Sequence, residues 1–210
     1  MFLFLIRHGR TAWNAQGRFQ GCRDVPLDET GRAQAKAMAL QAERIPFSAV
    51  WSSPLSRARE TAGFLARRKG LGVNMHEALS EIRHGKWEGL KADTVARRWP
   101  SAYRLWQERP QEVVMPGGES LGDVQARALA AIEDVSCCGD GCVAVVSHDA
   151  VIKVLLCAWL GLPLSGFRRF DLANASITGV RLNGDGAFLF LLGDISWSDA
   201  PYRREVQVSL

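Results

Sequence analysis

Met1-Phe-Leu-Phe-Leu-Ile-Arg-His-Gly9 opens the chain, and this stretch decides the fold. Residues 2–6 are continuously apolar, which is typical of a strand that is buried on both faces within a parallel sheet. Arg7-His8-Gly9 follows at once and begins a polar loop. In open α/β sheets, ligands bind beyond the carboxyl ends of the strands. We therefore predict a central strand that ends by presenting His8 to a ligand.

Strands and helices alternate along the rest of the chain. Helical spacing of Ala33, Ala37 and Leu40 predicts a helix from residue 30, and Ser53 with Pro54 has the pattern of a helix N-cap followed by a first-turn proline. The remaining predicted strands are 49–51, 73–76, 143–147, 177–182 and 188–192, and the remaining predicted helices are 91–99, 119–135 and 151–160. This alternation predicts an α/β fold, a three-layer sandwich with a mostly parallel central sheet flanked by helices.

The length of 210 residues fits a single domain spanning 1–210. The Trp-rich stretch at about 81–118 interrupts the pattern, and we expect it to form a helical insertion that packs over one end of the sheet, above the active site. The face of the helix at 119–135 that carries Leu121, Val124 and Ile132 is expected to be buried.

Composition excludes several classes of protein. Hydrophobic residues make up 47% of the chain and charged residues 23%, which fits a globular protein rather than a disordered one. The net charge of +4 is spread along the chain without a long Lys/Arg run, so nucleic acid is not an expected partner. The apolar start is too short for a signal peptide, and no apolar run approaches the ~20 residues of a membrane span.

The five cysteines are odd in number and irregular in spacing, so they predict no disulfide framework. Cys137-Cys138-Gly-Asp-Gly-Cys142 lacks the second ligand pair that a zinc site needs, and we interpret it as a glycine-rich loop with incidental thiols. Reduced cysteines fit a cytoplasmic location.

Three polar clusters follow directly after predicted strands. They are Arg7-His8-Gly9, Ser52-Ser53-Pro54 with Arg57, and Ser147-His148-Asp149. Taken singly, each has an ordinary structural explanation, such as a hydrogen-bonded histidine or a surface arginine. Together they bring two arginines and two histidines to one edge of the sheet, and arginine matches phosphate oxygens bidentately. The clusters therefore predict a phosphate pocket.

A series of motifs resembles the histidine phosphatase superfamily, also called the phosphoglycerate-mutase-like family. The similarity runs in order through nearly the whole chain, to about residue 192. Its motifs are Leu5-Ile-Arg-His-Gly-Arg-Thr-Ala-Trp-Asn14, Phe19-Gln-Gly21, Asp24-Val-Pro-Leu-Asp-Glu-Thr-Gly31, Ser52-Ser-Pro-Leu-Ser-Arg57-Ala-Arg-Glu-Thr-Ala62, Glu81-Ile-Arg-His-Gly-Lys-Trp-Glu-Gly89, Pro116-Gly-Gly-Glu-Ser120 and Val145-Val-Ser-His148. The phosphatase branch, similar to metal-independent phosphoserine phosphatase and α-ribazole phosphatase, is the nearest match.

The resemblance implies a role for each matching position. His8 resembles the nucleophile that becomes a phosphohistidine, and Glu81 resembles the proton donor. The phosphoryl clamp would consist of Arg7, Arg57 and His148. The substrate-binding positions would include Asn14, Gln20 and Gly21. No metal or other cofactor is implied, because the arginines neutralise the charge of the phosphoryl group.

Three features depart from the family pattern. Asp149 stands where glycine is common, and its carboxylate either pairs with an arginine or faces away. His84 is unusual in its motif and is either a pocket-wall residue or a substrate contact, as the similar phosphoserine phosphatases suggest. The tail at 193–197 is similar to a segment that approaches the pocket in such phosphatases.

The resemblance leaves three functions open. The short stretch between Glu81 and Pro116 favours a phosphomonoester hydrolase over a phosphoglycerate mutase, since cofactor-dependent mutases carry a longer insertion there. A non-catalytic member that binds phosphorylated ligands is the third alternative, although all five core positions are present.

The substrate is expected to be a small phosphorylated metabolite. Candidates are phosphoserine, α-ribazole phosphate, sugar phosphates and phosphoglycerate-type acids. Arg10, Arg23, Arg83 and His84 could form a basic rim, and we predict that Arg23 and His84 contact the non-phosphate end. No membrane partner is expected, and a homodimer could form through the apolar hairpin at 177–192 or through the tail.

Overall fold

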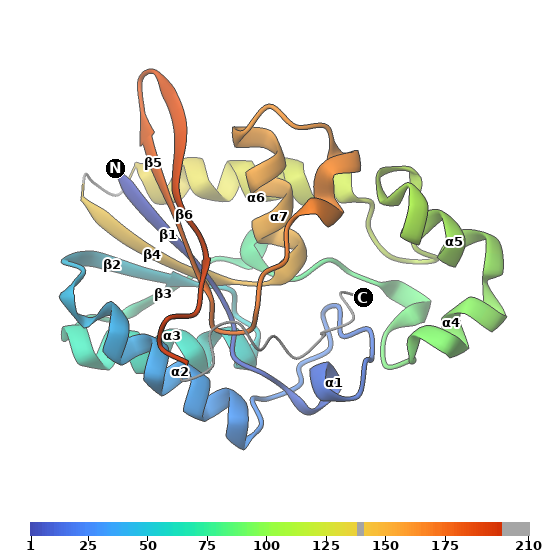
Figure 1. The fold of residues 1–210 in the computed structure, drawn as a ribbon, viewed down its shortest axis with the longest axis horizontal. Coiled ribbons are helices and arrows are strands. Elements are labelled where there is room, and N and C mark those ends of the chain that lie inside the picture. The colour runs from blue at the N-terminus through green and yellow to red at the C-terminus, as the bar shows by residue number, and fades with distance from the viewer. Residues whose placement is uncertain (138–140, 199–210) are drawn as a thin grey trace.

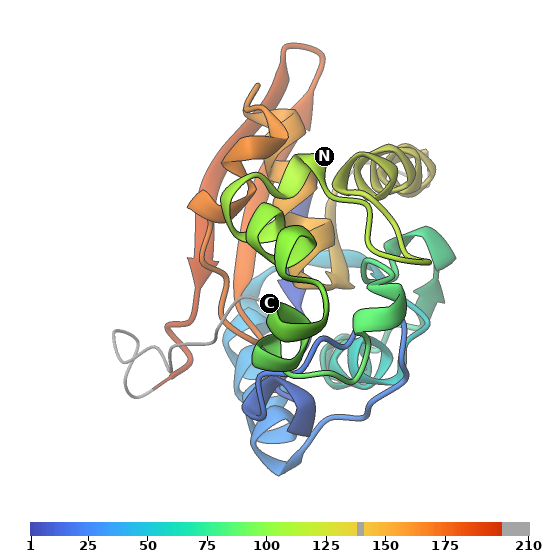
Figure 2. The same ribbon diagram turned by 90° about the vertical axis from the view of Figure 1, so that its right-hand side faces the viewer.

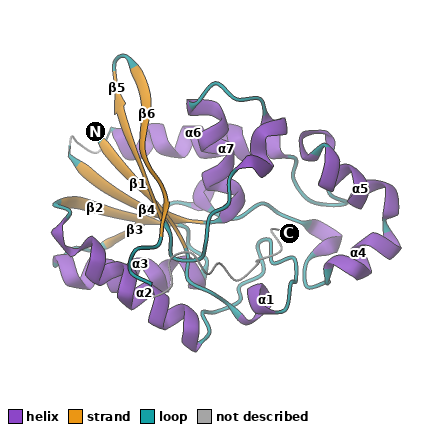
Figure 3. Cartoon of the chain, in the orientation of Figure 1, coloured by secondary structure: helices purple, strands orange, loops and turns teal. Residues whose placement is uncertain are grey.

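Six strands form one sheet in the computed structural model, which describes residues 1–137 and 141–198. The strand order is β3-β2-β4-β1-β5-β6 (Figures 1 and 3). The first four of these run parallel, whereas β5 is antiparallel to β1 and β6 to β5. The strands are β1 Phe2–Arg7, β2 Phe47–Ser52, β3 Val73–Met75, β4 Cys142–Ser147, β5 Ile177–Asn183 and β6 Gly186–Asp194. The predicted α/β fold with a mostly parallel sheet is confirmed.

Helices cover both faces of the sheet, α2 and α3 on one side and α6 and α7 on the other (Figure 1). The α-helices are α1 Ala12–Ala15, α2 Glu29–Gln41, α3 Ser56–Lys69, α4 Ala92–Arg98, α5 Pro100–Glu108, α6 Leu121–Ser136 and α7 Asp149–Trp159. Short 3₁₀ turns are η1 Ala42–Arg44, η2 Glu77–Leu79, η3 Gly85–Trp87, η4 Pro110–Glu112 and η5 Leu164–Arg169.

The apolar run of β1 divides between the two layers. Leu3 and Leu5 pack into the core under α6 and α7, whereas Phe4 and Ile6 pack into the core under α2 and α3. Successive side chains of a strand point to opposite faces, so a strand covered on both faces must be apolar at every position. The burial of β1 therefore fixes the strand whose end carries His8.

The predicted start of α3 is wrong. The helix begins at Ser56 with Leu55 as its N-cap, not at Ser53 and Pro54. The Asp24 carboxylate accepts the Ser56 N–H at 2.7 Å and so satisfies one of the free donors of the first turn. The capping pattern failed because tertiary contacts took over the role that the local sequence assigned to Ser53.

Of the buried faces predicted for α2 and α6, the first is wrong and the second is confirmed. In α2 the buried side chains include Ala35, Met38 and Ala39, whereas Ala33 and Leu40 are exposed, so the predicted face was wrong. Apolar residues occur all round this helix, and spacing alone could not select the face. In α6 the predicted face is buried, although Ser120 caps the helix and moves its start to Leu121.

The segment 81–118 contains two α-helices rather than the one predicted near 91–99. Pro100 ends α4, as expected, but it also occupies the first position of α5, where its missing N–H costs nothing. These helices lie to one side of the main layers and face the viewer in Figure 2. Trp106 of α5 is fully buried and joins the core under α6 and α7.

Two predictions fall wholly or partly outside the described residues. Cys138 lies in the gap of the glycine-rich loop, and the chain that continues the tail beyond residue 198 also lies outside the described residues. The described start of the tail contacts the body of the protein, since Trp197 Nε1 donates to the Ala175 carbonyl at 2.9 Å. Among the described residues, no helix has the length and apolar character needed to cross a membrane.

The two helix layers give a first test of the packing. Leu65 in α3 is fully buried, and Leu40 in α2 is 55% exposed. Leu65→Ala should lower the free energy of unfolding by about 2–5 kcal/mol, because it leaves a cavity in a close-packed core. Urea denaturation measures this, with Leu40→Ala as the matched control. Equal losses in the two variants would contradict the assignment of the core.

Candidate active site

Backbone contacts hold His8 rigidly at the carboxyl end of β1. Its N–H donates to the Ser147 carbonyl at 3.0 Å, and its own carbonyl accepts from Ala175 N and from Asn174 Nδ2. The next residue is fixed as well, since Gly9 N donates to Thr61 Oγ1 at 3.1 Å. The imidazole therefore projects from a backbone whose polar groups are satisfied on both sides.

Glycine is required after His8 because two chain segments nearly touch there. A Cβ on Gly9 would lie 2.4 Å from the carbonyl oxygen of Gly31, and a Cβ on Gly31 would lie 1.9 Å from that of Arg10. Both contacts are with backbone atoms, so no side-chain movement could relieve them. The glycine of the Arg-His-Gly motif thus lets the start of α2 pack against the loop that carries His8.

The hydrogen bonds of the His8 ring select one tautomer. Nδ1 lies 2.7 Å from the Gly9 carbonyl oxygen, which can only accept, so Nδ1 carries the proton of this bond. Nε2 then has a free lone pair, and Arg57 Nε donates to it at 3.3 Å. The nitrogen that faces Arg57 is therefore the one able to attack an electrophile.

Arg57 is fully buried and carries its charge into the site. Its Nη1 donates to the Arg23 carbonyl and its Nη2 to the Gly21 carbonyl, both at 2.8 Å. These carbonyls hold the guanidinium plane and stabilise it away from water, as a buried charge needs. Arg57 thus ties the start of α3 to the loop at 21–23 and to His8.

His148 lies beside His8 at the end of β4. The ring centroids are 5.0 Å apart, and His148 Nε2 lies 2.9 Å from Ser53 Oγ. Its Nδ1 is buried and has no hydrogen-bond partner. The predicted pair of histidines is therefore brought together, and one ring nitrogen of His148 makes no hydrogen bond within the protein.

Both histidines are held in the neutral form. Burial lowers the pKa of His8 well below its ordinary value, and the positive charges of Arg57 and Arg7 lower it further. Burial and the charge of Arg57 lower the pKa of His148 in the same way. At neutral pH, His8 therefore keeps the lone pair that a nucleophile requires.

Arg7 completes the group, and Asp149 pairs with it. Arg7 Nη1 donates to the Leu172 carbonyl, and the same atom lies 3.4 Å from Asp149 Oδ1. Arg7 Nε is buried without a protein partner. Asp149 therefore pairs with an arginine rather than facing away. We call the group of Arg7, His8, Arg57 and His148 the strand-end site.

Glu81 contributes a buried carboxyl group. Its Oε1 accepts the Ile82 N–H at 3.0 Å. Burial raises the pKa of Glu81, and the negative charge of Asp149 raises it further, while Arg57 and Arg7 act in the opposite direction. Because these charges all act on Glu81, its carboxyl group lies within electrostatic range of the strand-end site. A raised pKa suits a group that must donate a proton.

A hollow of about 410 Å³ lies beside Glu81. Residues on its wall include Cys22, Leu55, Ser80, Arg83, Glu119 and Arg127. Both charge signs occur there, and Arg127 is held by the Glu119 carboxylate at 2.9 Å. This hollow has room for polar groups next to the acid.

The other predicted contacts vary in position. Gln20 is buried and accepts from Thr11 Oγ1, whereas Asn14 makes its described hydrogen bonds to Thr11 at the start of α1. The side chain of Arg23 is 69% exposed and pairs with Glu88. His84 is buried between the Phe19 and Trp106 rings.

Basic residues of the expected rim are tied to neighbours. Arg10 pairs with Asp28 at 2.9 Å, and the largely exposed Arg83 lies 3.7 Å from Glu119. Neither arrangement joins the strand-end site directly.

Sequence reasoning missed three contacts of the site. Ser53 was included in the polar cluster after a predicted strand, but it was assigned a helix cap rather than its contact with His148. Asn174 and Thr61 hold the backbone around His8 from residues far along the chain. Thr61 lies within the quoted motif at 52–62 but was given no role there, and no motif that we recognised contains Asn174.

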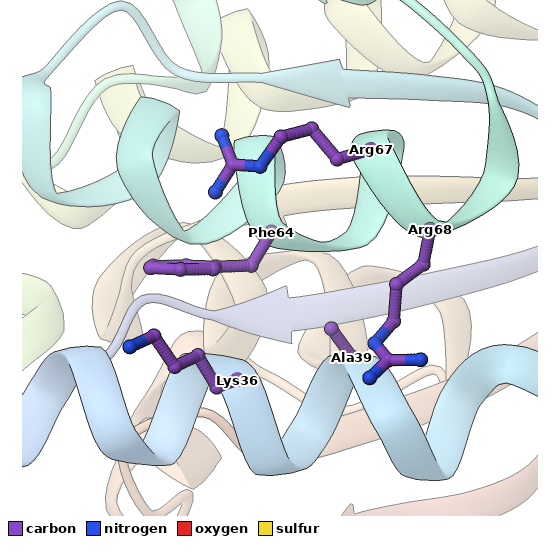
Figure 4. A pocket seen from close by; sticks show the side chains of 5 residues that line it. All are labelled: Lys36, Ala39, Phe64, Arg67 and Arg68. Atoms are coloured by element: carbon purple, nitrogen blue, oxygen red, sulfur yellow. The ribbon is translucent and has the colours of Figure 1, made fainter.

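A second hollow differs from the one beside Glu81 in the residues that line it. A groove of about 380 Å³ lies between α2 and α3 and is lined by Lys36, Ala39, Phe64, Arg67 and Arg68 (Figure 4). Its cations could attract anions, but its wall contains no histidine, cysteine or carboxylate. Across residues 1–137 and 141–198, no group of three or more His, Cys, Asp or Glu side chains is arranged to hold a metal ion.

Comparisons with known proteins agree with this geometry. The profile of the Histidine phosphatase superfamily (branch 1) matches residues 3–195. The chain is 38% identical over 181 residues to "Phosphoserine phosphatase 1" of Hydrogenobacter thermophilus, covering 86% of each protein. It is 32% identical over 211 residues to "Probable phosphoglycerate mutase GpmB" of Escherichia coli O1:K1 / APEC, covering 98% of each.

A solved structure is similar over nearly the whole chain. The mycobacterial glucosyl-3-phosphoglycerate phosphatase Rv2419c, in complex with VO3, superposes with a TM-score of 0.83 at 32% identity. The match covers 91% of this chain and 98% of that one. These comparisons confirm the resemblance that the motifs indicated.

The charge of Arg57 can be tested through its effect on the nearest ring. In Arg57→Met, the pKa of His8 should rise, because the removed charge is a main cause of its lowering after burial. NMR titration of the ring carbons measures the midpoint. Arg67→Met, which removes a charge from the groove between α2 and α3, is the control. An unchanged His8 midpoint in Arg57→Met would contradict the contact.

Proposed function

The chain belongs to the histidine phosphatase superfamily (branch 1) and is a histidine phosphatase; on that premise, we propose that it hydrolyses small phosphomonoesters through a phosphorylated His8. The observation that carries the proposal is the state of the His8 ring. Its Nδ1–H is fixed on the Gly9 carbonyl, so Nε2 offers its lone pair toward the buried Arg57. A neutral nucleophile facing a cation is the arrangement that attack on a phosphoryl group requires.

The first step transfers the phosphoryl group to His8. Nε2 forms a bond to phosphorus while the bond from phosphorus to the ester oxygen breaks, and its electron pair leaves with that oxygen. Glu81 in its acid form gives a proton to the leaving oxygen. The guanidinium groups of Arg7 and Arg57 meet the charge that gathers on the non-bridging phosphoryl oxygens.

The second step returns the enzyme to its starting state. The Glu81 carboxylate takes a proton from water as the water oxygen bonds to phosphorus. The bond between phosphorus and Nε2 breaks, and its electron pair returns to the ring of His8. His148 has a buried and unpartnered Nδ1, which suits it to contact the phosphoryl group in both steps.

The relatives and the pocket support a proposal for the substrate class. The similar proteins are named for phosphoserine and for glucosyl-3-phosphoglycerate, and both are small phosphomonoesters that carry a carboxylate. Arg23 and His84 would meet the non-phosphate end. His84 suits this role because its Nδ1 is buried without a hydrogen-bond partner.

Phosphoglycerate mutase is the second candidate, because one relative has that probable name. A mutase returns the phosphoryl group to its product and keeps water out. The short segment after Glu81 favours hydrolysis. Incubation with 3-phosphoglycerate separates the two functions. A phosphatase releases inorganic phosphate, whereas a mutase forms 2-phosphoglycerate and releases no inorganic phosphate.

Removal of the nucleophile tests the proposed function. His8→Ala should lower kcat for p-nitrophenyl phosphate by at least about 10³-fold, because attack through nitrogen is lost. The measurement is release of inorganic phosphate. His76→Ala removes a histidine that pairs with Asp134 on the surface and should retain activity. Equal rates in wild type and His8→Ala would remove His8 from the mechanism.

The effect of removing the acid on the rate should depend on the leaving group of the ester. Glu81→Gln should lower kcat for phenyl phosphate by about 10²-fold, because this poor leaving group needs a proton. The loss should be smaller for p-nitrophenyl phosphate, whose phenolate leaves without one, provided that phosphoryl transfer limits the rate. Equal losses for both esters in single-turnover experiments would contradict the role of Glu81 as the acid.

The pH profile gives a test with a defined sign. The raised pKa of Glu81 keeps its carboxyl group protonated to higher pH than an ordinary glutamate, and activity should fall as pH rises through that pKa. The pKa of His8 is lowered, so the ring stays neutral at pH values well below the ordinary pKa of histidine. The kcat/KM profile for phenyl phosphate should therefore retain activity below pH 6.5 and decline on the basic side. A loss of activity on acidification that is centred near the ordinary pKa of histidine, about 6.5, would contradict the account.

A further inference from the structure

Helix α7 carries a buried lysine that the proposed mechanism does not use. Residues 150–157 of this helix are apolar apart from Lys153, and Lys153 is as buried as its neighbours. Lysine is rarely placed inside a protein unless a partner meets its charge, because removing an ammonium group from water is costly. A specific interaction must therefore hold Lys153 there.

That partner is Asp149, one helical turn earlier. Lys153 Nζ lies 2.7 Å from Asp149 Oδ2, and the two residues have the i,i+4 spacing that aligns side chains along a helix. Lys153 Nζ also lies over the Phe167 ring, 5.3 Å from its centre. The lysine is thus fixed on two sides, and its charge fixes one oxygen of Asp149.

The other oxygen of Asp149 faces the strand-end site. Oδ1 lies 3.4 Å from Arg7 Nη1, the atom that also donates to the Leu172 carbonyl. The Leu172 carbonyl and the Asp149 carboxylate thus both contact Nη1 of Arg7, while Nε of Arg7 is buried without a protein partner. Nη1 of Arg7 is therefore held by the hydrogen bond to Leu172 and by an ion pair with Asp149 that includes no hydrogen bond, and Nε remains a donor without a partner.

We propose that Lys153 and Asp149 are positioning residues, in which Lys153 orients the Asp149 carboxylate and Asp149 orients Arg7 toward the phosphoryl group. This inference rests on the proposed phosphatase function. Preorganised donors stabilise a transition state more than flexible ones, because they need no rearrangement during the reaction. Neither residue belongs to the strand-end site, so both act on the phosphoryl group through Arg7.

Asp149 has a second effect, on Glu81. Its negative charge is the main cause, after burial, that raises the pKa of the Glu81 carboxyl group. Loss of that charge should lower the pKa of Glu81 and move the basic limb of the pH profile to lower pH. This shift reports the charge of Asp149 at Glu81, whereas a loss of rate constant at pH values below that limb reports the position of Arg7.

The experiment compares Asp149→Asn, Lys153→Met and the double variant in single-turnover hydrolysis of phenyl phosphate across pH. Asp149→Asn should lower the rate constant by about 10- to 100-fold, as expected when a clamping group is misplaced. Its basic limb should move to lower pH. Lys153→Met should also lower the rate constant, but the double variant should be no slower than Asp149→Asn alone, because the lysine acts only through the aspartate.

Folding is followed separately by thermal denaturation. Asp149→Asn leaves Lys153 buried without its partner and should lower Tm, whereas the double variant removes both charges and should recover part of the loss. Glu43→Gln, which breaks the exposed ion pair with Arg68, is the control for losing one carboxylate. It should change neither rate nor pH profile.

The outcomes separate the inference from the proposed function. If wild type releases no phosphate from any ester tested, the proposed function fails first. If wild type is active and the folded double variant keeps the wild-type rate constant and basic limb, the pair only stabilises α7 and the inference is overturned. A double variant slower than Asp149→Asn by the full Lys153→Met factor would also overturn it, because the two residues would then act independently.

Discussion

The contact between Arg57 and His8 is the interaction on which the site depends. A fully buried guanidinium donates to Nε2 of a neutral ring, and two carbonyls of the loop at 21–23 hold it in place. This arrangement joins β1, α3 and that loop through one charged group. The charge of Arg57 also lowers the pKa of His8. Arg57 therefore both places a cation beside the nucleophile and keeps that nucleophile unprotonated.

Around this contact, the site is built from backbone as much as from side chains. β1 lies between β4 and β5, so the residues after β4 and before β5 reach His8 directly. The close approach of Gly9 to Gly31 brings the start of α2 to the same point. Buried positive and negative charges then have different effects on the site. The arginines favour anions, and Asp149 limits the positive field that acts on Glu81.

The parts that followed from the sequence are those set by local pattern. An apolar run at 2–6 is typical of a strand covered on both faces, and polar residues that follow three parallel strands are expected to meet at one edge of the sheet. The start of α3 and the buried face of α2 could not be obtained in this way. The Asp24 carboxylate displaced Ser53 from its expected cap, and spacing could not choose among the apolar positions of α2. The contact of Asn174 with the His8 carbonyl depends on topology alone.

The central claim is that a covalent bond forms between phosphorus and His8, and direct detection of that bond tests it most closely. Protein mixed with a ³²P-labelled monoester and quenched in alkali within milliseconds should carry label that is stable to base and released by acid. Fragmentation mass spectrometry should place the added phosphate on the peptide that contains His8, and His8→Ala should carry none. Phosphate release by an active protein without any such label, or label on another residue, would contradict the account.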